Sequence, residues 1–267
     1  MRYLAVAMVF GALATPAWAQ GDEPRFCPNR PSLGSSACTT EPGQVQFEAS
    51  GFDWELDRDA DERQDTFLIG DAVARFGIGP HTEVQVAWTP LGIVRTRDRL
   101  TGAVDRQTRV GDVTVAVRQN FKNPDGSGLS FGVQPFVTLP VGREPVGAGD
   151  WAAGALIPVT YDLTDHLNLQ FTGEVDAAVD EDGDGRHLRY SAIVGLAQDL
   201  GEQVTLTGEV MLERDRDPAD HATHALGALS LAWQPAKTWQ LDVLAVGGLN
   251  HDSPDVRLVF GGAILFR

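Results

Sequence analysis

The chain of 267 residues has no long apolar run after its first nineteen residues. A membrane-spanning helix needs about 18 consecutive apolar residues, and the mean hydropathy of the chain is slightly negative, at −0.14. A protein that crosses the membrane with helices is therefore excluded.

Positive charge is also scarce, because 21 Lys and Arg residues face 37 Asp and Glu residues, for a formal net charge of −16. Nucleic-acid binding needs clustered Lys and Arg to neutralise phosphates, so nucleic acid is not an expected partner. The sequence also shows no nucleotide-binding loop and no recognisable plug domain or energy-coupling segment. Transport, if any, is expected to run down a gradient, and no cofactor is expected.

Cysteine is limited to Cys27 and Cys38, which enclose a short segment rich in Pro, Gly and Ser. In an oxidising periplasm the two are expected to form a disulfide; a redox or metal pair is the alternative, but no partner ligands lie nearby. The disulfide is predicted to tie off a mobile N-terminal extension and to carry no chemistry.

The N-terminus has the three parts of a secretory signal. Arg2 supplies the positive start, residues 4–13 the apolar core, and Ala17-Trp18-Ala19 a cleavage site. We predict a signal peptide over residues 1–19, an N-terminal extension over 20–43 and one β domain over 44–267.

The β domain alternates apolar and polar residues with the period of two that strands require. Between Asp65 and Phe76, one face carries Leu68, Gly70, Ala72, Ala74 and Phe76, and the other carries Asp65, Asp71 and Arg75. About twelve such segments recur, and this pattern is typical of a closed antiparallel outer-membrane β-barrel with both termini in the periplasm. A secreted soluble sandwich, with the apolar face as its core, is the alternative.

Connections between the segments are alternately short and long, as periplasmic turns and extracellular loops are in such barrels. The longest predicted loop runs from Thr89 to Thr108. The arginines in and next to this loop are expected to guard the entrance; they are Arg95, Arg97, Arg99, Arg106 and Arg109.

Aromatic residues lie near the ends of the predicted strands on the apolar phase, where an interfacial belt needs them. They are Trp88, Phe121, Trp151, Tyr161, Trp233, Trp239 and Phe266. The closing strand also ends in an apolar alternation, although Arg267 follows Phe266.

Charged residues in the polar phase must face the lumen, because a charge facing lipid costs about 2–4 kcal/mol near the midplane. If hydrated they line a pathway, and if paired they brace a closed lumen. Leu156, Ile193, Leu226 and Leu244 share this phase, which suits uncharged or aromatic solutes. The residues assigned to line the pore are Asp71, Arg75, Arg118, Glu174, Arg189, Glu209 and Asp242.

Three motifs could indicate catalysis or metal binding, but each lacks a feature that such a site requires. Residues 128–132 match the G-x-S-x-G pattern, but Ser130 lies in a strand that continues, whereas a nucleophile elbow turns into a helix. Asp180, Asp182 and Asp184 begin like a calcium loop whose twelfth position, Ser191, is not the required Glu; weak calcium binding stays open. His221 and His224 lack an evident third ligand. No catalytic residue and no metal site are therefore assigned.

Several loop motifs resemble one outer-membrane family. They are Gly111-Asp112, Thr138-Leu139-Pro140-Val141-Gly142, the stretch from Val146 to Trp151, and Gly248-Leu249-Asn250 with the residues up to Asp255. The chain from about Gln44 onwards thereby resembles the family called putative MetA-pathway of phenol degradation. The resemblance implies a transporter-like or channel-like barrel, with a link to the breakdown of aromatic compounds.

The sequence thus predicts an outer-membrane channel or facilitator for passive diffusion of small molecules, with aromatic or hydrophobic ones as the expected class. Its expected partners are outer-membrane lipids, the barrel-assembly machinery and a small-molecule solute. An outer-membrane enzyme acting on lipids and a secreted β-rich binding protein are the alternatives.

Overall fold

The computed structural model describes residues 24–267, and the predicted signal peptide lies outside them. No helix in this part of the chain has the length and apolar character to cross a membrane. All its regular elements are strands: β1 (Val45–Arg58), β2 (Glu62–Ile69), β3 (Ala72–Gly79), β4 (Thr82–Trp88), β5 (Leu91–Asp98), β6 (Val104–Arg109), β7 (Val113–Lys122), β8 (Leu129–Leu139), β9 (Ala152–Thr164), β10 (Leu167–Val179), β11 (Arg186–Asp199), β12 (Val204–Asp215), β13 (Thr223–Ala236), β14 (Trp239–Gly248) and β15 (Val256–Phe266).

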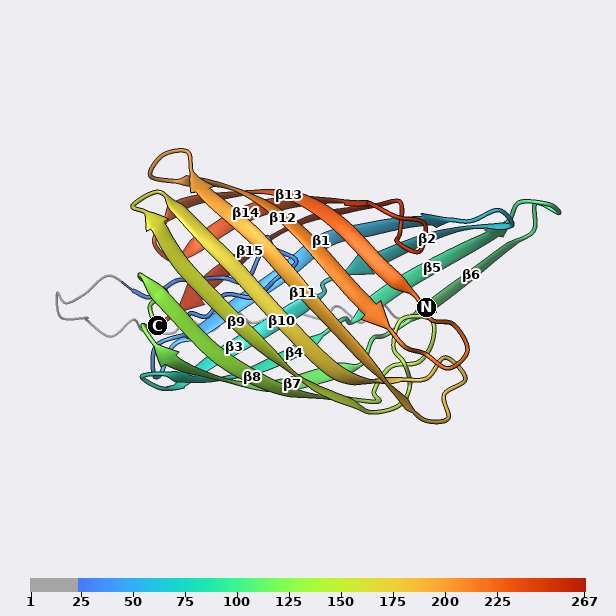
Figure 1. The fold of residues 1–267 in the computed structure, drawn as a ribbon, viewed down its shortest axis with the longest axis horizontal. Coiled ribbons are helices and arrows are strands. Elements are labelled where there is room, and N and C mark those ends of the chain that lie inside the picture. Colours follow the sequence, from blue (N-terminus) through green and yellow to red (C-terminus); the bar gives the residue numbers. More distant parts are fainter. Residues whose placement is uncertain (1–23) are drawn as a thin grey trace, which may run out of the picture.

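The strands form a closed antiparallel barrel, because β1 pairs with β15 at one edge and with β2 and β3 at the other. At three positions in the wall, the chain forms two consecutive strands that are separated by a short break. These pairs are β2 and β3, β4 and β5, and β6 and β7. The wall therefore has twelve strands, as predicted (Figure 1). The breaks fall where a ladder is hard to continue: Gly70 has a φ of 73°, and Pro90 has no N–H to donate.

The barrel is polar inside and apolar outside, the reverse of a soluble protein. Arg75 and Glu83 are fully buried, whereas Phe121 and Val210 on the outer face are 59% and 51% exposed. An exposed apolar belt around a closed barrel is stable in lipid and not in water. The chain is therefore a bacterial outer-membrane protein, and the sandwich alternative is wrong.

Both ends of the barrel chain lie at the same rim, since Val45 of β1 pairs with Phe266 of β15. This rim carries the short connections and is thus the periplasmic one. Six of the seven predicted belt aromatics are well exposed, and Trp239 packs edge-on against Trp233 at 5.8 Å.

Val210→Arg tests the orientation of the wall. An arginine there would face lipid, so we expect the free energy of unfolding to fall by about 2–4 kcal/mol. Leu100→Arg is the control, because Leu100 is 81% exposed at the tip of a hairpin and a surface change costs about 0.5 kcal/mol or less. Urea unfolding in lipid vesicles measures both, and equal losses would contradict the assignment.

The prediction of a loop from Thr89 to Thr108 is wrong. Most of it forms β5 and β6, which with β2 and the end of β1 project beyond the extracellular rim (Figure 1). Strand β6 is exposed on both faces along nearly its whole length, so it needs no apolar alternation, and the arginine-rich sequence was misleading for that reason. Arg95 lies 3.5 Å from Asp65, and Arg99 donates to the carbonyl of Asp59 at 2.5 Å. These arginines brace the projection.

Candidate functional site

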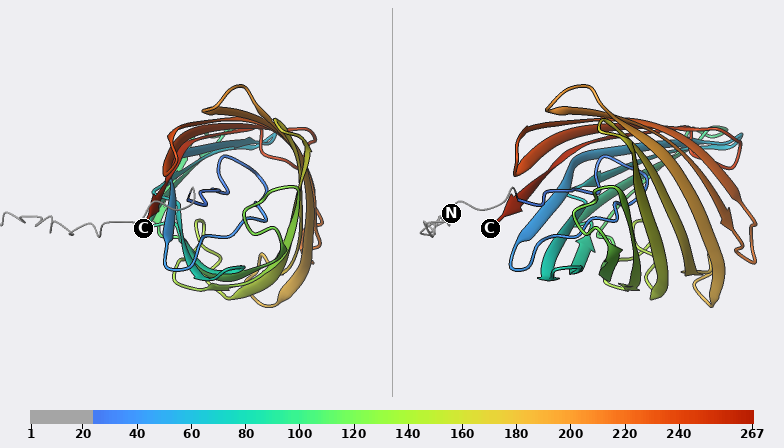
Figure 2. Two further views of the ribbon diagram at one scale, coloured as in Figure 1. Left: turned by 90° about the vertical axis from the view of Figure 1, so that its left-hand side faces the viewer. Right: turned by 60° about the vertical axis from the view of Figure 1, so that its left-hand side comes forward.

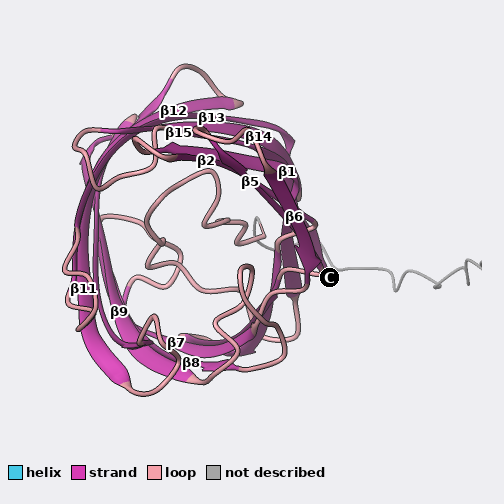
Figure 3. Ribbon diagram, turned by 90° about the vertical axis from the view of Figure 1, so that its right-hand side faces the viewer, coloured by secondary structure: helices cyan, strands magenta, loops and turns pink. Residues whose placement is uncertain are grey.

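Residues 24–43, here called the inner segment, lie inside the barrel (Figures 2 and 3). They precede β1 and turn back from the periplasmic rim into the lumen. Wall strands on opposite sides of the barrel hold them: β1, β3, β4 and β7 on one side, and β10, β12, β13 and β14 on the other. The mobile extension expected from the sequence is thus an ordered plug, because its many backbone donors and acceptors find partners in the wall.

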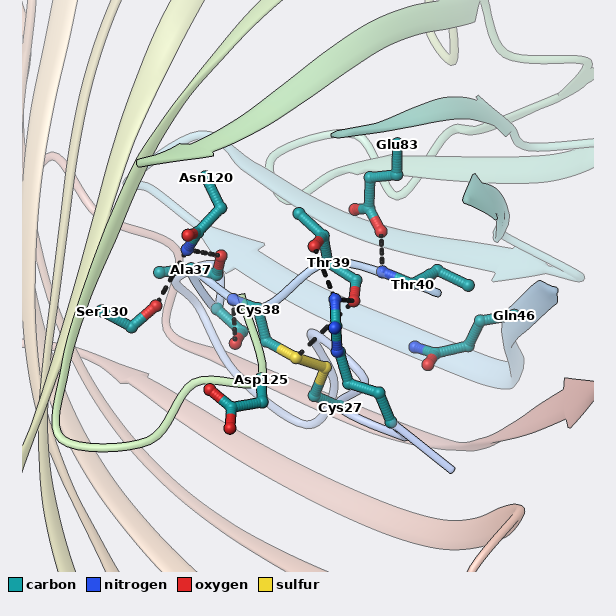
Figure 4. Close-up of a disulfide and its surroundings, with 12 residues drawn as sticks. Cys27, Ala37, Cys38, Thr39, Thr40, Gln46, Glu83, Asn120, Asp125 and Ser130 are labelled. Carbon is teal, nitrogen blue, oxygen red and sulfur yellow. Dashed lines mark hydrogen bonds between the residues drawn. A yellow bond between two sulfur atoms is a disulfide. The ribbon is translucent and has the colours of Figure 1, made fainter. Parts of the chain in front are cut away.

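The disulfide predicted between Cys27 and Cys38 is present and closes a loop of the inner segment, with its Cα atoms 6.2 Å apart. The periplasmic turn 123–128 reaches in beside it: the amide of Thr39 donates to the carbonyl of Pro124 at 2.9 Å. Figure 4 shows Asn120 and Ser130 of the wall on one side of this loop and Glu83 on another. The disulfide therefore shapes the obstruction in the lumen.

A buried charge network fixes this loop to the wall. Arg75 donates to Glu48 at 3.0 Å and to Glu83 at 3.0 Å, and all three side chains are at most 1% exposed. The same guanidinium donates to the carbonyl of Cys27 at 2.7 Å and to that of Cys38 at 2.9 Å. One arginine thereby bridges two wall carboxylates and holds both ends of the disulfide loop.

Arg118 completes the network from β7. It donates to the carbonyl of Cys38 at 3.0 Å and to Gln134 at 2.8 Å, and lies 3.4 Å from Glu83. Glu83 in turn accepts from the amide of Thr40 at 2.6 Å. Charge-assisted bonds of this kind are about twice as strong as neutral ones, so the loop is held firmly.

The opposite side of the inner segment is held by two acidic wall residues. Arg30 forms an ion pair with Asp242 of β14 at 2.8 Å. Glu209 of β12 accepts from the hydroxyl of Ser32 at 2.6 Å and from the amide of Leu33 at 2.9 Å. The segment therefore spans the lumen from wall to wall.

A cavity of about 190 Å³ remains on the extracellular side of the inner segment. Leu33, Leu244 and Val259 form its apolar wall, and Leu244 and Val259 belong to a buried apolar cluster with Val246. Its polar side includes Asp71 and the guanidinium groups of Arg30 and Arg257. Six of the ten residues that line the cavity are polar or charged, so a small apolar wall faces a mostly polar lining.

The seven residues assigned to the pore all lie on the inner face, but in three groups. Arg75, Arg118, Glu209 and Asp242 hold the inner segment. Asp71 lines the 190 Å³ cavity. Glu174 and Arg189 line a second cavity, of about 350 Å³, nearer the extracellular rim, where Arg189 pairs with Asp176 at 2.7 Å.

Three residues of this site were not singled out from the sequence. Glu48, Glu83 and Asn120 are each at most 1% exposed and contact the inner segment or its arginines. Their position in the polar phase of β1, β4 and β7 was the available signal. The inner segment itself gave none, because irregular chain shows no periodicity.

Three of the four loop motifs that carry the family resemblance meet at Asp112. Its carboxylate accepts from the amides of Gly142 at 2.8 Å and Ala148 at 2.7 Å. A Cβ added to Gly142 would lie 2.5 Å from the carbonyl of Val110, so that position needs glycine. Asp112 therefore fixes the extracellular loop 140–151 to the start of β7.

The motifs that suggested other chemistry lie apart from the inner segment or serve the fold. Ser130 is buried in β8, where its hydroxyl donates to the carbonyl of Asn123 at 2.8 Å; the strand continues, unlike a nucleophile elbow. His221 is exposed, and His224 lies opposite Glu213 in the β12–β13 ladder. Asp182 accepts from the amide of Asp184 at 2.9 Å within its own loop.

Electrostatics at the extracellular rim favour ionised carboxylates. The amide of Ala219 donates to Asp217 and lowers the pKa of that carboxyl group, with the amide of Glu181 adding to the effect. The pKa of Asp150 is lowered by its hydrogen bond from Arg186. Both groups lie in loops outside the membrane-spanning strands and are negatively charged near neutral pH.

Among solved structures, the COG4313 outer membrane channel from Pseudomonas putida F1 has a similar fold. Its TM-score is 0.68 with 13% sequence identity, over 86% of this chain and 97% of that chain. The translocator domain of the autotransporter NalP from Neisseria meningitidis has a TM-score of 0.52 with 14% identity, over 85% of this chain and 90% of that chain. At these identities the likeness concerns the fold.

No curated protein matches the chain in sequence. A family model, however, matches residues 28–266, which include most of the inner segment and the whole barrel. The loop motifs gathered around Asp112 lie within the same range. The chain therefore belongs to the family described as "Putative MetA-pathway of phenol degradation".

Proposed function

We propose that the protein is a passive outer-membrane channel for small molecules with a single aromatic ring. The closed barrel, its polar inner wall and the similarity to an outer membrane channel support a channel. The inner segment restricts the solute to a narrow path between itself and the wall. The family name, which refers to phenol degradation, agrees with an aromatic solute.

The observation that carries the proposal is the cavity beside Leu33. An engineered apolar cavity of about 150 Å³ can hold benzene, and this cavity measures about 190 Å³. Leu33, Leu244 and Val259 would contact the ring, while Ser50 and Arg257 at the polar side would meet a hydroxyl or carboxylate substituent. The hydroxyl groups of a sugar that lie against this apolar wall would lack partners, which costs free energy.

The seven charged residues of the inner face act in this channel in two ways. Those that hold the inner segment set the width of the path, and Asp71, Glu174 and Arg189 line the cavities along it. The closing strand, which ends in an exposed Phe266, is the segment that we propose meets the barrel-assembly machinery.

Leu244→Trp tests the path. The larger side chain would fill the apolar side of the cavity, so we expect several-fold slower entry of benzoate into proteoliposomes. Ala245→Trp is the matched control, because Ala245 is the next residue of β14 and is exposed on the outer face. A path elsewhere in the barrel would leave the two variants equally fast, and that result would contradict the proposal.

A further inference from the structure

A cluster of one histidine and three aspartates lies at the extracellular rim, away from the inner segment. His187 is the second residue of β11, and its side chain is 6% exposed. Asp180 lies in the β10–β11 loop, Asp215 ends β12, and Asp217 lies in the loop that follows. Two extracellular connections therefore meet at one imidazole ring.

The donor atoms are close enough to share one cation. His187 Nδ1 lies 2.9 Å from Asp180 Oδ1 and 3.4 Å from Asp217 Oδ2, and these three ligand atoms all lie within 4.8 Å of one another. Separations near 3 Å are those of neighbouring ligands around a metal with bonds of about 2.0–2.2 Å. The other ring nitrogen, Nε2, lies 2.8 Å from Asp215 Oδ1.

A neutral His187 cannot satisfy these neighbours. If Nδ1 carries the proton and donates to Asp180, the bare lone pair of Nε2 faces the carboxylate of Asp215. Nε2 is indeed a buried atom without a hydrogen-bond partner in the part of the chain described here, despite its 2.8 Å distance from that carboxylate oxygen. A buried polar atom in this state needs an explanation; a cation bound at Nδ1 would supply one, because it moves the ring proton to Nε2, beside Asp215.

The charge balance of this cluster also favours a bound cation. Three carboxylates face one imidazole, and the nearby arginines are engaged elsewhere: Arg186 pairs with Asp150, and Arg189 pairs with Asp176. The three carboxylates are partly buried, with side chains 10–20% exposed, and such groups are stabilised by pairing or by coordinating a metal. A divalent cation would supply the missing positive charge.

We propose that Asp180, His187 and Asp217 bind a first-row divalent transition metal, of which Zn²⁺ is the probe. The ligand atoms are His187 Nδ1, Asp180 Oδ1 and Asp217 Oδ2. Nε2 then carries the proton and lies 2.8 Å from Asp215 Oδ1, a carboxylate of the kind that commonly supports a metal-bound histidine. Calcium is disfavoured, because it takes six to eight oxygen ligands and an imidazole suits Zn²⁺ and its neighbours.

The test is competitive Zn²⁺ titration of the refolded full chain after chelator treatment, with metal content measured in parallel. We expect one saturable site per chain, and His187→Ala should weaken binding by about 100-fold or more. Asp215→Asn should weaken it by about 10–100-fold, the effect typical of a residue that supports a ligand. Asp182→Asn and His221→Ala are matched controls from the same loops and should bind as the wild type does.

Folding of each variant is checked by the shift of the folded barrel in unheated gel samples. The proposal is overturned if folded wild-type protein shows no saturable Zn²⁺ site, since His187 is then an imidazolium between carboxylates. Unchanged binding by His187→Ala, or displacement of Zn²⁺ by an equal concentration of Ca²⁺, would overturn it too.

Discussion

Removal of residues 24–43 is expected to turn a narrow path into a wide pore. Twelve strands enclose a lumen between the filled eight-stranded barrels and the water-filled sixteen-stranded porins. Here the inner segment fills that space, held on one side by Arg75 and on the other by Asp242 and Glu209. The barrel closes through β1 and β15 without it, so the deletion variant should fold.

Planar-bilayer recording measures this change directly. The deletion variant should show open channels of much larger conductance, and its proteoliposomes should admit disaccharides that the wild type excludes. A variant with both Cys27 and Cys38 replaced by Ser is expected to be intermediate. The hydrogen bonds between the inner segment and the wall remain in it, so its conductance should rise less than that of the deletion variant. Equal conductance of wild type and deletion variant would show that the inner segment does not obstruct the lumen.

Arg75→Met should be the most destabilising single substitution in the lumen. It would leave Glu48 buried without a cation and Glu83 with Arg118 alone, and stranding a buried charge in this way costs about 3–5 kcal/mol. The carbonyls of Cys27 and Cys38 would also lose a donor. Urea unfolding in vesicles would report the loss.

Arg58→Met is the matched control. Arg58 pairs with Asp255 at 3.0 Å, but the two side chains are 51% and 34% exposed, and such surface pairs contribute about 0–1 kcal/mol. Adding Glu48→Gln to Arg75→Met should restore part of the stability, because the stranded charge of Glu48 is removed while Glu83 keeps Arg118 at 3.4 Å. A loss no larger than that of Arg58→Met would contradict the role assigned to the network.

The wall of the barrel was predictable because lipid and lumen impose opposite polarity on neighbouring residues. Asp65 and Arg75 were placed on the inner face from the period of two alone, and both are buried there. The projection formed by β5 and β6 was not predicted, because beyond the membrane both faces of a strand contact water. Its arginines therefore resembled those of a loop.

The inner segment was not predictable for a different reason. Its contacts join residues far apart in the sequence, such as Arg30 with Asp242, which are separated by 212 positions. The alternation of apolar and polar residues along the chain does not indicate such a long-range pairing. The rim cluster shows the same limit: Asp180 was noted as part of a calcium-like loop, but its neighbours His187 and Asp217 come from other elements.

Liposome swelling tests the central claim most directly, which is that the barrel passes small aromatic molecules beside the inner segment. Vesicles with refolded wild-type protein are compared with empty ones, using benzoate and a sugar of similar size that cross bare bilayers slowly. The account predicts swelling above the empty vesicles, with faster entry of benzoate than of the sugar. No entry of either solute, from protein shown to be folded, would contradict it.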